Sequence, residues 1–307
     1  RCSLKRSSNI RIIKRKTFKI MEEILHRPRR SVLYVPGSNE KAHSKIPTLD
    51  VDALIYDLED AVAPAAKDQA RLAIISLVNS NQNSKKEQVV RLNSDDNEFG
   101  KKDYEVLEKC EPDAILIPKV NAPEDVLKYV PYLQNKKTMI WAMMETPHAI
   151  INANDIASCS KKLNCFVMGT NDLSKELDLN DVMRRTGLET SILTCLIAAK
   201  ANKISLIDGV YNNIKDAKGF EEECKYGSGL GLDGKTLIHP SQVDICNKVY
   251  SPSDDEINDA EKIVLTYEEA RKENPKVGVI IVDGKQIEEL HVIRARKLLA
   301  FKNLLGK

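Results

Sequence analysis

Acidic side chains follow directly behind an apolar run early in the sequence. The stretch ALIYDLEDAV (53–62) is apolar for four residues and then presents Asp57, Glu59 and Asp60. Further apolar runs close with Arg91, Asn93, Lys119, Glu145, Asn171, Asp172 and His239. If these run ends meet at one edge, five carboxylates lie beside one arginine and one lysine and need a counter-ion. A hard divalent cation such as Mg²⁺ fits, because it takes one or two protein carboxylates and leaves its other positions to water and substrate.

Glu145 and Asp172 are the candidate metal ligands, because they close neighbouring runs. The alternative for Asp172 is a structural one, the N-cap of a helix that starts at Leu173. Glu145 stands between two methionines and a Thr-Pro pair, where capping is less natural. For Glu145 the sequence therefore favours metal or substrate binding.

Arg91 is charged at a position where a buried strand should stay apolar. Its guanidinium could bind a carboxylate or a developing enolate oxygen in bidentate fashion. It could equally form a structural ion pair with the acids that close the preceding run. Both interpretations stay open, and they are compatible with each other.

Two lysines one turn apart, Lys41 and Lys45, follow the first apolar run. They could hold a phosphorylated ligand, although the spacing alone is better explained by a solvated helix face. His239 could likewise bond only to backbone beside Pro240. The stretch GSGLGLDG (227–234) has the reverse order of a dinucleotide-binding loop and predicts a helix C-cap and a connecting loop.

The elements that must position these residues alternate along the chain. Segments with helical periodicity, such as 65–80, 122–134 and 187–202, separate the apolar runs. The eight runs of strand length are 31–37, 53–60, 88–93, 114–120, 138–146, 165–173, 205–210 and 235–240. Eight strand–helix repeats with doubly apolar strands predict a parallel sheet closed into a (β/α)8 barrel, whose chemistry lies at the C-terminal ends of the strands.

Three parts are predicted along the chain. Residues 1–28 form a basic leader without a structural role, and residues 29–274 form the barrel, with a helix over 254–274 completing the eighth unit. Residues 275–307 form an extension that contains a short hairpin (VGVIIVDGK) and an amphipathic helix. Because the barrel does not require this extension, we expect it to form a lid or to pack on a neighbouring subunit.

Charge and composition exclude several classes of protein. The first twenty residues hold eight Lys or Arg and no acid, and removing these charges from the net charge of +2 leaves −6. The remainder of the chain is therefore negatively charged, which does not favour binding to nucleic acid. No apolar run reaches the ~18 residues of a membrane span. Seven cysteines without a CxxC pair predict neither disulfides nor zinc, and a reducing compartment. The leader resembles an organellar transit peptide or precedes an ordinary start at Met21, so the expected location is the cytoplasm, or the mitochondrial matrix in the first case.

Seven motifs in order carry a family resemblance, namely RRSVLYVPGSNEK, LIYDLEDAV, VVRLNS, ILIPKV, MMETP, MGTNDL and DGKTLIHPSQ. From about residue 29 onward the chain resembles the citrate lyase β-subunit-like CoA-ester lyases of the HpcH/HpaI aldolase superfamily. The resemblance implies a homotrimer of (β/α)8 barrels. It also implies an enzyme that uses Mg²⁺ to cleave or form the C–C bond of a 3-hydroxyacyl-CoA such as malyl-CoA or citramalyl-CoA.

The resemblance also assigns roles to residues. Glu145 and Asp172 match the metal ligands, and Asp60 adjoins the metal through water. Arg91 contacts a substrate oxygen, and Glu145 also contacts the substrate, as part of the metal site. The positions that match CoA-binding residues are Tyr34, Lys41, Lys45, Lys67, Ile238, His239 and Pro240. Alternation then separates Asp57 and Glu59 from Asp60, so that Asp57 is structural and Glu59 is a partner of Arg91 or of a lysine.

Two departures from the family pattern affect the expected reaction. Aligning the extension places Glu288 where relatives use an aspartate as acid/base, donated to a neighbouring subunit, and misplacing a catalytic group by ~1 Å can cost ~100-fold in rate. Asn171 stands where many relatives have Glu. A malyl-CoA thioesterase that uses the same metal site therefore stays open, as does a citrate lyase β subunit that acts on a carrier-bound citryl thioester.

Overall fold

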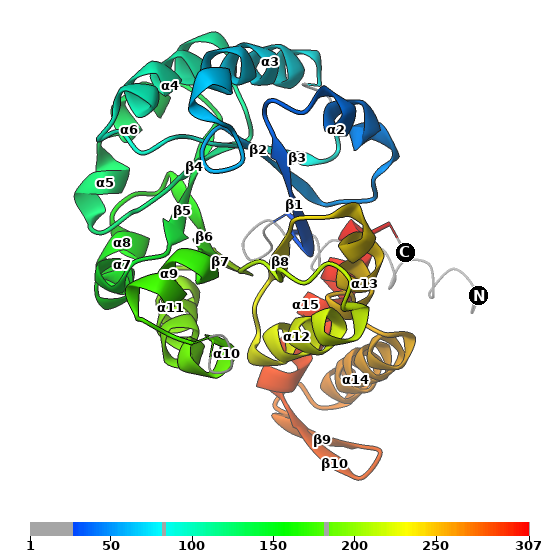
Figure 1. The fold of residues 1–307 in the computed structure, drawn as a ribbon. Helices are drawn as coiled ribbons and strands as arrows, with labels where there is room; N and C mark the ends of the chain where they lie inside the picture. The colour runs from blue at the N-terminus through cyan, green and yellow to red at the C-terminus, as the bar shows by residue number, and fades with distance from the viewer. Residues whose placement is uncertain (1–26, 82–83, 181–183, 307) are drawn as a thin grey trace. The chain divides into compact units, whose positions relative to one another are not determined.

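Eight parallel strands close into a barrel in which each strand pairs with its neighbours in chain order (Figure 1). The computed structural model describes residues 27–81, 84–180 and 184–306, so most of the predicted leader lies outside the described residues. The strands are β1 (Ser31–Pro36), β2 (Ala53–Asp57), β3 (Glu87–Arg91), β4 (Ala114–Ile117), β5 (Met139–Met144), β6 (Leu163–Met168), β7 (Ser205–Asp208) and β8 (Gly234–Leu237). Pairing of β1 with β8, for example Val32 with Thr236, closes the ring. The predicted (β/α)8 barrel is confirmed.

Strand residues alternate between the barrel interior and the surrounding helices. Ala53 and Ile55 of β2 and Val89 of β3 belong to the interior cluster, whereas Leu54 and Tyr56 belong to the larger cluster between barrel and helices. The same alternation places Asp57 and Arg91, the last residues of β2 and β3, in register with the interior set. Charged groups thus replace the apolar interior at the C-terminal ends of these strands.

Helices surround the strands and provide the second apolar layer (Figure 1). In the part of the chain that the structure describes, no helix combines the length and the apolar character needed to cross a bilayer. These helices are α2 (Glu40–Lys45), α3 (Lys67–Ser80), α4 (Glu98–Lys109), α5 (Pro123–Leu127), α6 (Val130–Leu133), α7 (Pro147–Ile151), α8 (Ala153–Ser158), α9 (Thr170–Glu176), α10 (Arg184–Gly187), α11 (Glu189–Ala201), α12 (Ala217–Leu230) and α13 (Val243–Val249). Helix α12 ends at Gly231, whose φ of 96° provides the predicted C-cap.

The N-terminal end of the barrel is filled by a buried arginine. Arg29 Nη2 lies 2.7 Å from Glu87 Oε1, and the Arg29 guanidinium lies 4.6 Å from the centre of the Trp141 ring. Because Glu87 begins β3, this ion pair closes the end of the barrel away from the acidic residues. The opposite end is left for a cavity.

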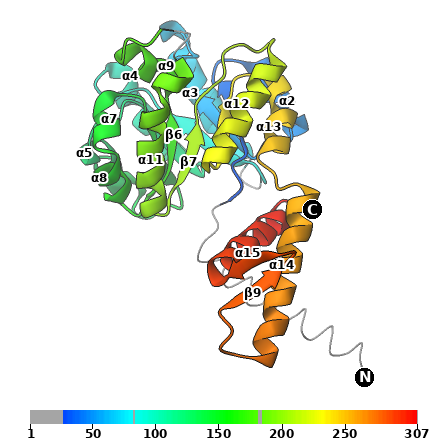
Figure 2. The same cartoon turned by 90° about the horizontal axis from the view of Figure 1, so that it is seen from below.

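A second compact unit follows the barrel and contains residues from Ser251 onward. Its elements are α14 (Asp254–Glu273), β9 (Val279–Val282), β10 (Lys285–Glu288) and α15 (Glu289–Leu304). Figure 2 shows α14 beside α15, and a shared apolar cluster joins both to the hairpin. Asp283 and Gly284 form the hairpin turn with φ of 50° and 75°, which right-twisted antiparallel strands favour. The predicted hairpin and final helix are confirmed.

The boundary between the two units differs from the predicted one at 274/275. The barrel unit is Arg29–Tyr250, and α13 rather than α14 follows β8. The apolar face of α14, which includes Ala260, Val264 and Tyr267, packs against the hairpin and α15. Periodicity correctly predicts that a helix forms here, but it does not say which core the helix covers.

Candidate active site

A cavity of about 290 Å³ opens at the C-terminal ends of the barrel strands. Its lining comes from strand ends and from the loops that follow them. Among the lining residues are Tyr34, Asp60, Arg91, Glu145, Asp172 and Ile238. The structure therefore brings together four of the five residues to which the sequence assigned catalytic, substrate or metal roles, and the fifth, Glu288, belongs to the second compact unit.

Arg91 is held by a buried bidentate ion pair. Its Nε lies 2.7 Å from Asp57 Oδ1, and its Nη2 lies 2.5 Å from Asp57 Oδ2. The ring of Tyr34 lies beneath the guanidinium, 5.0 Å from its centre. Asp57 also accepts hydrogen bonds from the backbone N–H groups of Glu59 and Ala61. The structural interpretation of Arg91 is thus correct, and the same side chain also faces the cavity.

All three acids of the LEDAV corner meet this one guanidinium. Arg91 Nη1 lies 2.9 Å from Glu59 Oε2 and 3.4 Å from Asp60 Oδ2. The prediction that alternation separates Asp60 from the other two acids was wrong, because β2 ends at Asp57 and a turn follows. The expected pairing of Glu59 with Arg91 is confirmed. The side chain of Asp60 is 68% exposed, and it lines the cavity together with the buried Asp57, whereas Glu59 is absent from the lining.

Glu145 is a buried acid whose carboxylate is fixed by backbone. It is 1% exposed, and its Oε1 accepts a 2.6 Å hydrogen bond from the N–H of Lys119, which has the left-handed φ of 50°. Burial raises the pKa of Glu145 to about 7, and the nearby Asp172 adds to this, whereas the Lys119 N–H lowers it. Burial likewise raises the pKa of Glu59 to about 8, although Arg91 lowers it. Burial, together with neighbouring acids, thus favours the neutral forms of both carboxyl groups.

Asp172 is not the N-cap of its helix. Helix α9 begins at Thr170 with Gly169 as its cap residue, so Asp172 lies in the first turn and lines the cavity. The capping alternative was therefore wrong, because the helix starts three residues earlier than predicted.

The donor set suits a hard cation better than a closed metal cage. Among residues 27–81, 84–180 and 184–306, no group of three His, Cys, Asp or Glu side chains is arranged to hold a metal ion. Glu145 and Asp172 offer two carboxylates beside an open cavity. Mg²⁺ needs no more than one or two protein carboxylates, and a bound cation would offset the charge that raises the pKa of Glu145.

Six of the seven predicted CoA-binding residues lie in three places. Lys41 and Lys45 are exposed on α2. Ile238 lines the cavity, and the next two residues, His239 and Pro240, are exposed. His239 Nδ1 accepts a hydrogen bond from the N–H of Ser241 and also lies 2.8 Å from the Ser241 hydroxyl oxygen, so this histidine bonds to backbone as expected, but not to backbone alone. Tyr34 lies in the cavity beneath Arg91.

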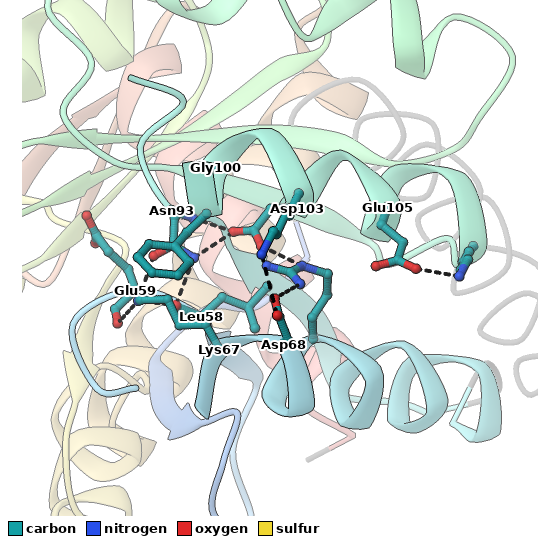
Figure 3. A network of polar contacts seen from close by, with 12 residues as sticks. Leu58, Glu59, Lys67, Asp68, Asn93, Gly100, Asp103 and Glu105 are labelled. Atoms are coloured by element: carbon teal, nitrogen blue, oxygen red, sulfur yellow. Dashed lines mark hydrogen bonds and ion pairs between the residues drawn. The ribbon is translucent and has the colours of Figure 1, made fainter. Parts of the chain in front are cut away.

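Lys67 requires a correction. It is buried, and its Nζ donates to the carbonyls of Leu58 and Glu59, each at 2.8 Å, and to Asn93 Oδ1 at 2.7 Å (Figure 3). A lysine ammonium has three protons, so these bonds leave none for a CoA phosphate. The family resemblance implied a CoA contact here, and a matching motif position does not reveal that this lysine points inward.

Glu288 lies in the second unit, at the end of β10. Its backbone N–H donates to His291 Nδ1 at 3.0 Å, and its Oε1 accepts from Gln286 Nε2 at 3.2 Å. Its acid/base role stays a prediction.

The cavity also contains residues that the sequence did not single out. Thr170 is buried, and its hydroxyl has no hydrogen-bond partner. Asn212 Nδ2 donates to Asn171 Oδ1 at 2.9 Å, which joins the loops after β6 and β7. Thr170 lies inside the predicted run 165–173 and Asn212 lies two residues after the run 205–210, so considering every polar residue near the end of a run would have found them.

The closed barrel and its charged cavity define a (β/α)8 barrel of the enzyme type. The chain belongs to the HpcH/HpaI aldolase/citrate lyase family, which it matches over residues 30–240.

Two relatives match most of the chain. The (3S)-malyl-CoA thioesterase of Cereibacter sphaeroides is 44% identical over 276 residues, covering 89% of this chain and 94% of that protein. Citrate lyase subunit beta of Escherichia coli is 32% identical, covering 91% and 95%. Among solved structures, the citrate lyase beta subunit from Mycobacterium tuberculosis complexed with oxaloacetate and magnesium aligns with a TM-score of 0.62 at 27% identity, covering 73% of this chain and 98% of that one.

Gly169→Ala should displace Glu145. A Cβ at residue 169 would lie 2.3 Å from Glu145 Cβ and 2.5 Å from its Oε2. We expect overpacking to lower the free energy of unfolding by about 1–3 kcal/mol, measured by urea denaturation. Gly229→Ala is the control, because nothing lies within 4 Å of its added Cβ, and it should be neutral or stabilising. Equal effects of the two variants would contradict close packing at Gly169.

Glu59 should make stability depend on pH. Its pKa is raised from 4.5 to about 8, so the folded chain keeps a proton that the unfolded chain has released. Its contribution to the free energy of unfolding therefore falls as pH rises from about 4.5 to about 8. Glu59→Gln, which mimics the neutral form, should gain stability relative to the parent across this range in urea denaturation without divalent cations. The exposed control Glu108→Gln should show no such trend. If the free energy of unfolding of Glu59→Gln instead varies with pH in the same way as that of the parent, the raised pKa of Glu59 is excluded.

Proposed function

We propose that this protein is a Mg²⁺-dependent carbon–carbon lyase that cleaves or forms the C–C bond of a 3-hydroxyacyl-CoA such as malyl-CoA or citramalyl-CoA. The single observation that carries the proposal is the buried Glu145 carboxylate, which lines one cavity together with Asp172 and Arg91. Anionic and cationic groups at one cavity suit an acyl group that carries both metal-binding oxygens and a carboxylate.

Glu145 and Asp172 are the residues proposed to hold the metal, with Asp60 close by through water. Bound Mg²⁺ would act as a Lewis acid toward the hydroxyl and carboxylate oxygens of the acyl group. The Lys119 N–H orients Glu145 for this task without adding a side chain to the cavity.

Arg91 is proposed to bind a substrate oxygen and to stabilise negative charge as it develops on an enolate. Its contacts with Asp57, Glu59 and Asp60 involve all three nitrogens of the guanidinium. Its orientation is therefore fixed before any substrate arrives, and preorganised charge needs no reorganisation during the reaction.

The remaining assignments follow the family resemblance. Lys41 and Lys45 are proposed to bind CoA phosphates, and Tyr34 and Ile238–Pro240 to contact the thioester arm. Glu288 is proposed as the acid that protonates the enolate carbon, donated by a neighbouring subunit of a homotrimer.

A thioesterase is the second candidate, because the relatives that are 44% identical are named (3S)-malyl-CoA thioesterase. In this case water would attack the thioester carbonyl in the same cavity. The two reactions give different products from one substrate.

Incubation of the full chain with malyl-CoA and Mg²⁺ tests the proposal. We expect acetyl-CoA and glyoxylate, separated by liquid chromatography, and a loss of turnover when a chelator removes the cation. Free CoA and malate as the first products would exclude the lyase and support the thioesterase. Activity only on a carrier-bound citryl thioester would exclude both of these activities and support a citrate lyase β subunit.

Glu145→Ala should abolish Mg²⁺-dependent turnover while leaving the fold intact, because it removes a proposed metal ligand. We expect a rate loss of ~100-fold or more, with circular dichroism as the check on folding. Exposed Glu176→Ala, at the other end of α9, should keep full activity. Undiminished turnover by Glu145→Ala would remove this residue from the metal site.

A further inference from the structure

Lys67 occupies a costly position. It is the first residue of α3 and is 7% exposed. The positive end of the helix dipole opposes a cation there, and burial of an ammonium requires compensating partners. Burial lowers the pKa of Lys67, whereas the nearby acids raise it. A lysine in this position needs bonds that repay its desolvation.

The partners of Lys67 all lie behind the acidic rim. Its three protons go to the carbonyls of Leu58 and Glu59 and to Asn93 Oδ1 (Figure 3). The ring of Phe99 lies 5.4 Å from the ammonium. Lys67 is absent from the lining of the cavity, so its charge acts through the backbone that it holds.

The two carbonyls belong to the corner between Asp57 and Asp60. Glu59 is the acid that meets Arg91 at 2.9 Å, and Asp60 is the acid that reaches the cavity. The corner has other fixed points, because the Leu58 N–H donates to the Arg91 carbonyl at 3.0 Å and the Glu59 N–H donates to Asp57 Oδ1 at 2.8 Å. The bonds from Lys67 add to these by tying two successive carbonyls of the corner, those of Leu58 and Glu59, to the start of α3.

The other end of the network is anchored in two helices. Asn93 donates to Leu58 O at 2.9 Å, and its N–H and Nδ2 both donate to Asp103 Oδ2 at 2.7 Å. Asp103 of α4 in turn accepts from Arg71 Nε of α3 at 2.9 Å. Figure 3 shows this chain of contacts running from the corner into the two helices. The corner is thus tied to the rigid scaffold.

We propose that Lys67 is a positioning residue that fixes the Leu58–Asp60 corner, so that Asp60 stands at the metal site and Glu59 against Arg91. This inference rests on the proposed function, because it takes the cavity to be a cation and acyl-CoA site. It separates Lys67 from the exposed Lys41 and Lys45, which remain the proposed phosphate ligands.

Lys67→Met tests the inference on the full chain, with Mn²⁺ as the probe and electron paramagnetic resonance as the measurement of binding. We expect Mn²⁺ affinity to fall at least ~10-fold, because partners behind a metal site typically contribute 10–100-fold. The turnover number should fall by up to ~100-fold, because the corner is misplaced. The dissociation constant of free CoA should stay unchanged, since Lys67 has no proton for a phosphate.

Arg71→Met is the matched control. Arg71 lies one turn further along α3, is equally buried and belongs to the same network, but it contacts Asp68 and Asp103 and not the corner. It should lower the free energy of unfolding while changing Mn²⁺ affinity less than ~3-fold. If it weakens Mn²⁺ binding as much as Lys67→Met does, general loosening explains the effect and the inference fails.

Lys67→Arg keeps the inference testable if Lys67→Met does not fold. A guanidinium keeps the buried charge and binds phosphate well, but its planar fork cannot direct three bonds to one corner. A positioning role predicts weakened Mn²⁺ binding, whereas a phosphate ligand predicts unchanged Mn²⁺ and CoA affinity. Weaker CoA binding with normal Mn²⁺ affinity in either variant would overturn the inference.

Measurements of Mn²⁺ binding and of CoA-ester turnover on the protein without substitutions separate this inference from the proposed function. If it binds Mn²⁺ but converts no CoA ester, the proposed reaction fails while Mn²⁺ affinity still decides the role of Lys67. If it binds no Mn²⁺, the metal site and the role of Lys67 fail together.

Discussion

The ion pair between Arg91 and Asp57 is the interaction on which the rim depends. Both side chains are buried at the ends of adjacent strands, and a buried charge that loses its partner is strongly destabilising. Because Asp57 binds two N–H groups on one edge of the guanidinium, Arg91 has one orientation. Glu59, Asp60 and the Tyr34 ring are then arranged around a fixed cation. The pair therefore contributes both to the stability of the barrel and to the geometry of its cavity.

One arginine does not balance the acids around it. Asp57 takes two of its N–H groups, and burial, with a smaller contribution from neighbouring acids, raises the pKa values of Glu59 and Glu145. A cation in the cavity would favour the charged forms of these carboxylates. The acids have overlapping roles. Asp57 and Glu59 hold Arg91, whereas Asp57, Asp60, Glu145 and Asp172 line the cavity.

Sequence patterns predicted the strands, the barrel, the hairpin and the polar ring at the strand ends, because period-two and helical spacing depend on local burial. They failed where a single residue chooses between partners. The family resemblance placed Lys67 among the CoA contacts, but its side chain points into a buried network. Asp172 followed a cap pattern, but its helix begins earlier. The three acids of LEDAV meet at Arg91 because a turn, and not strand geometry, sets their directions. The boundary after Tyr250 was missed because α14 is amphipathic in a way that suits either core.

The main-chain bond from Lys119 to Glu145 has a further consequence for how such sites diverge. Its donor is the backbone N–H of Lys119, which has the left-handed φ of 50°, so the bond does not use the lysine side chain. Side chains at residue 119 can therefore change through evolution while the support for Glu145 persists, and only proline would remove the donor. Glycine or asparagine would relieve strain, whereas β-branched residues would increase it. A comparison of residue identities across distant relatives would thus undervalue this position, since what is inherited there is a backbone geometry.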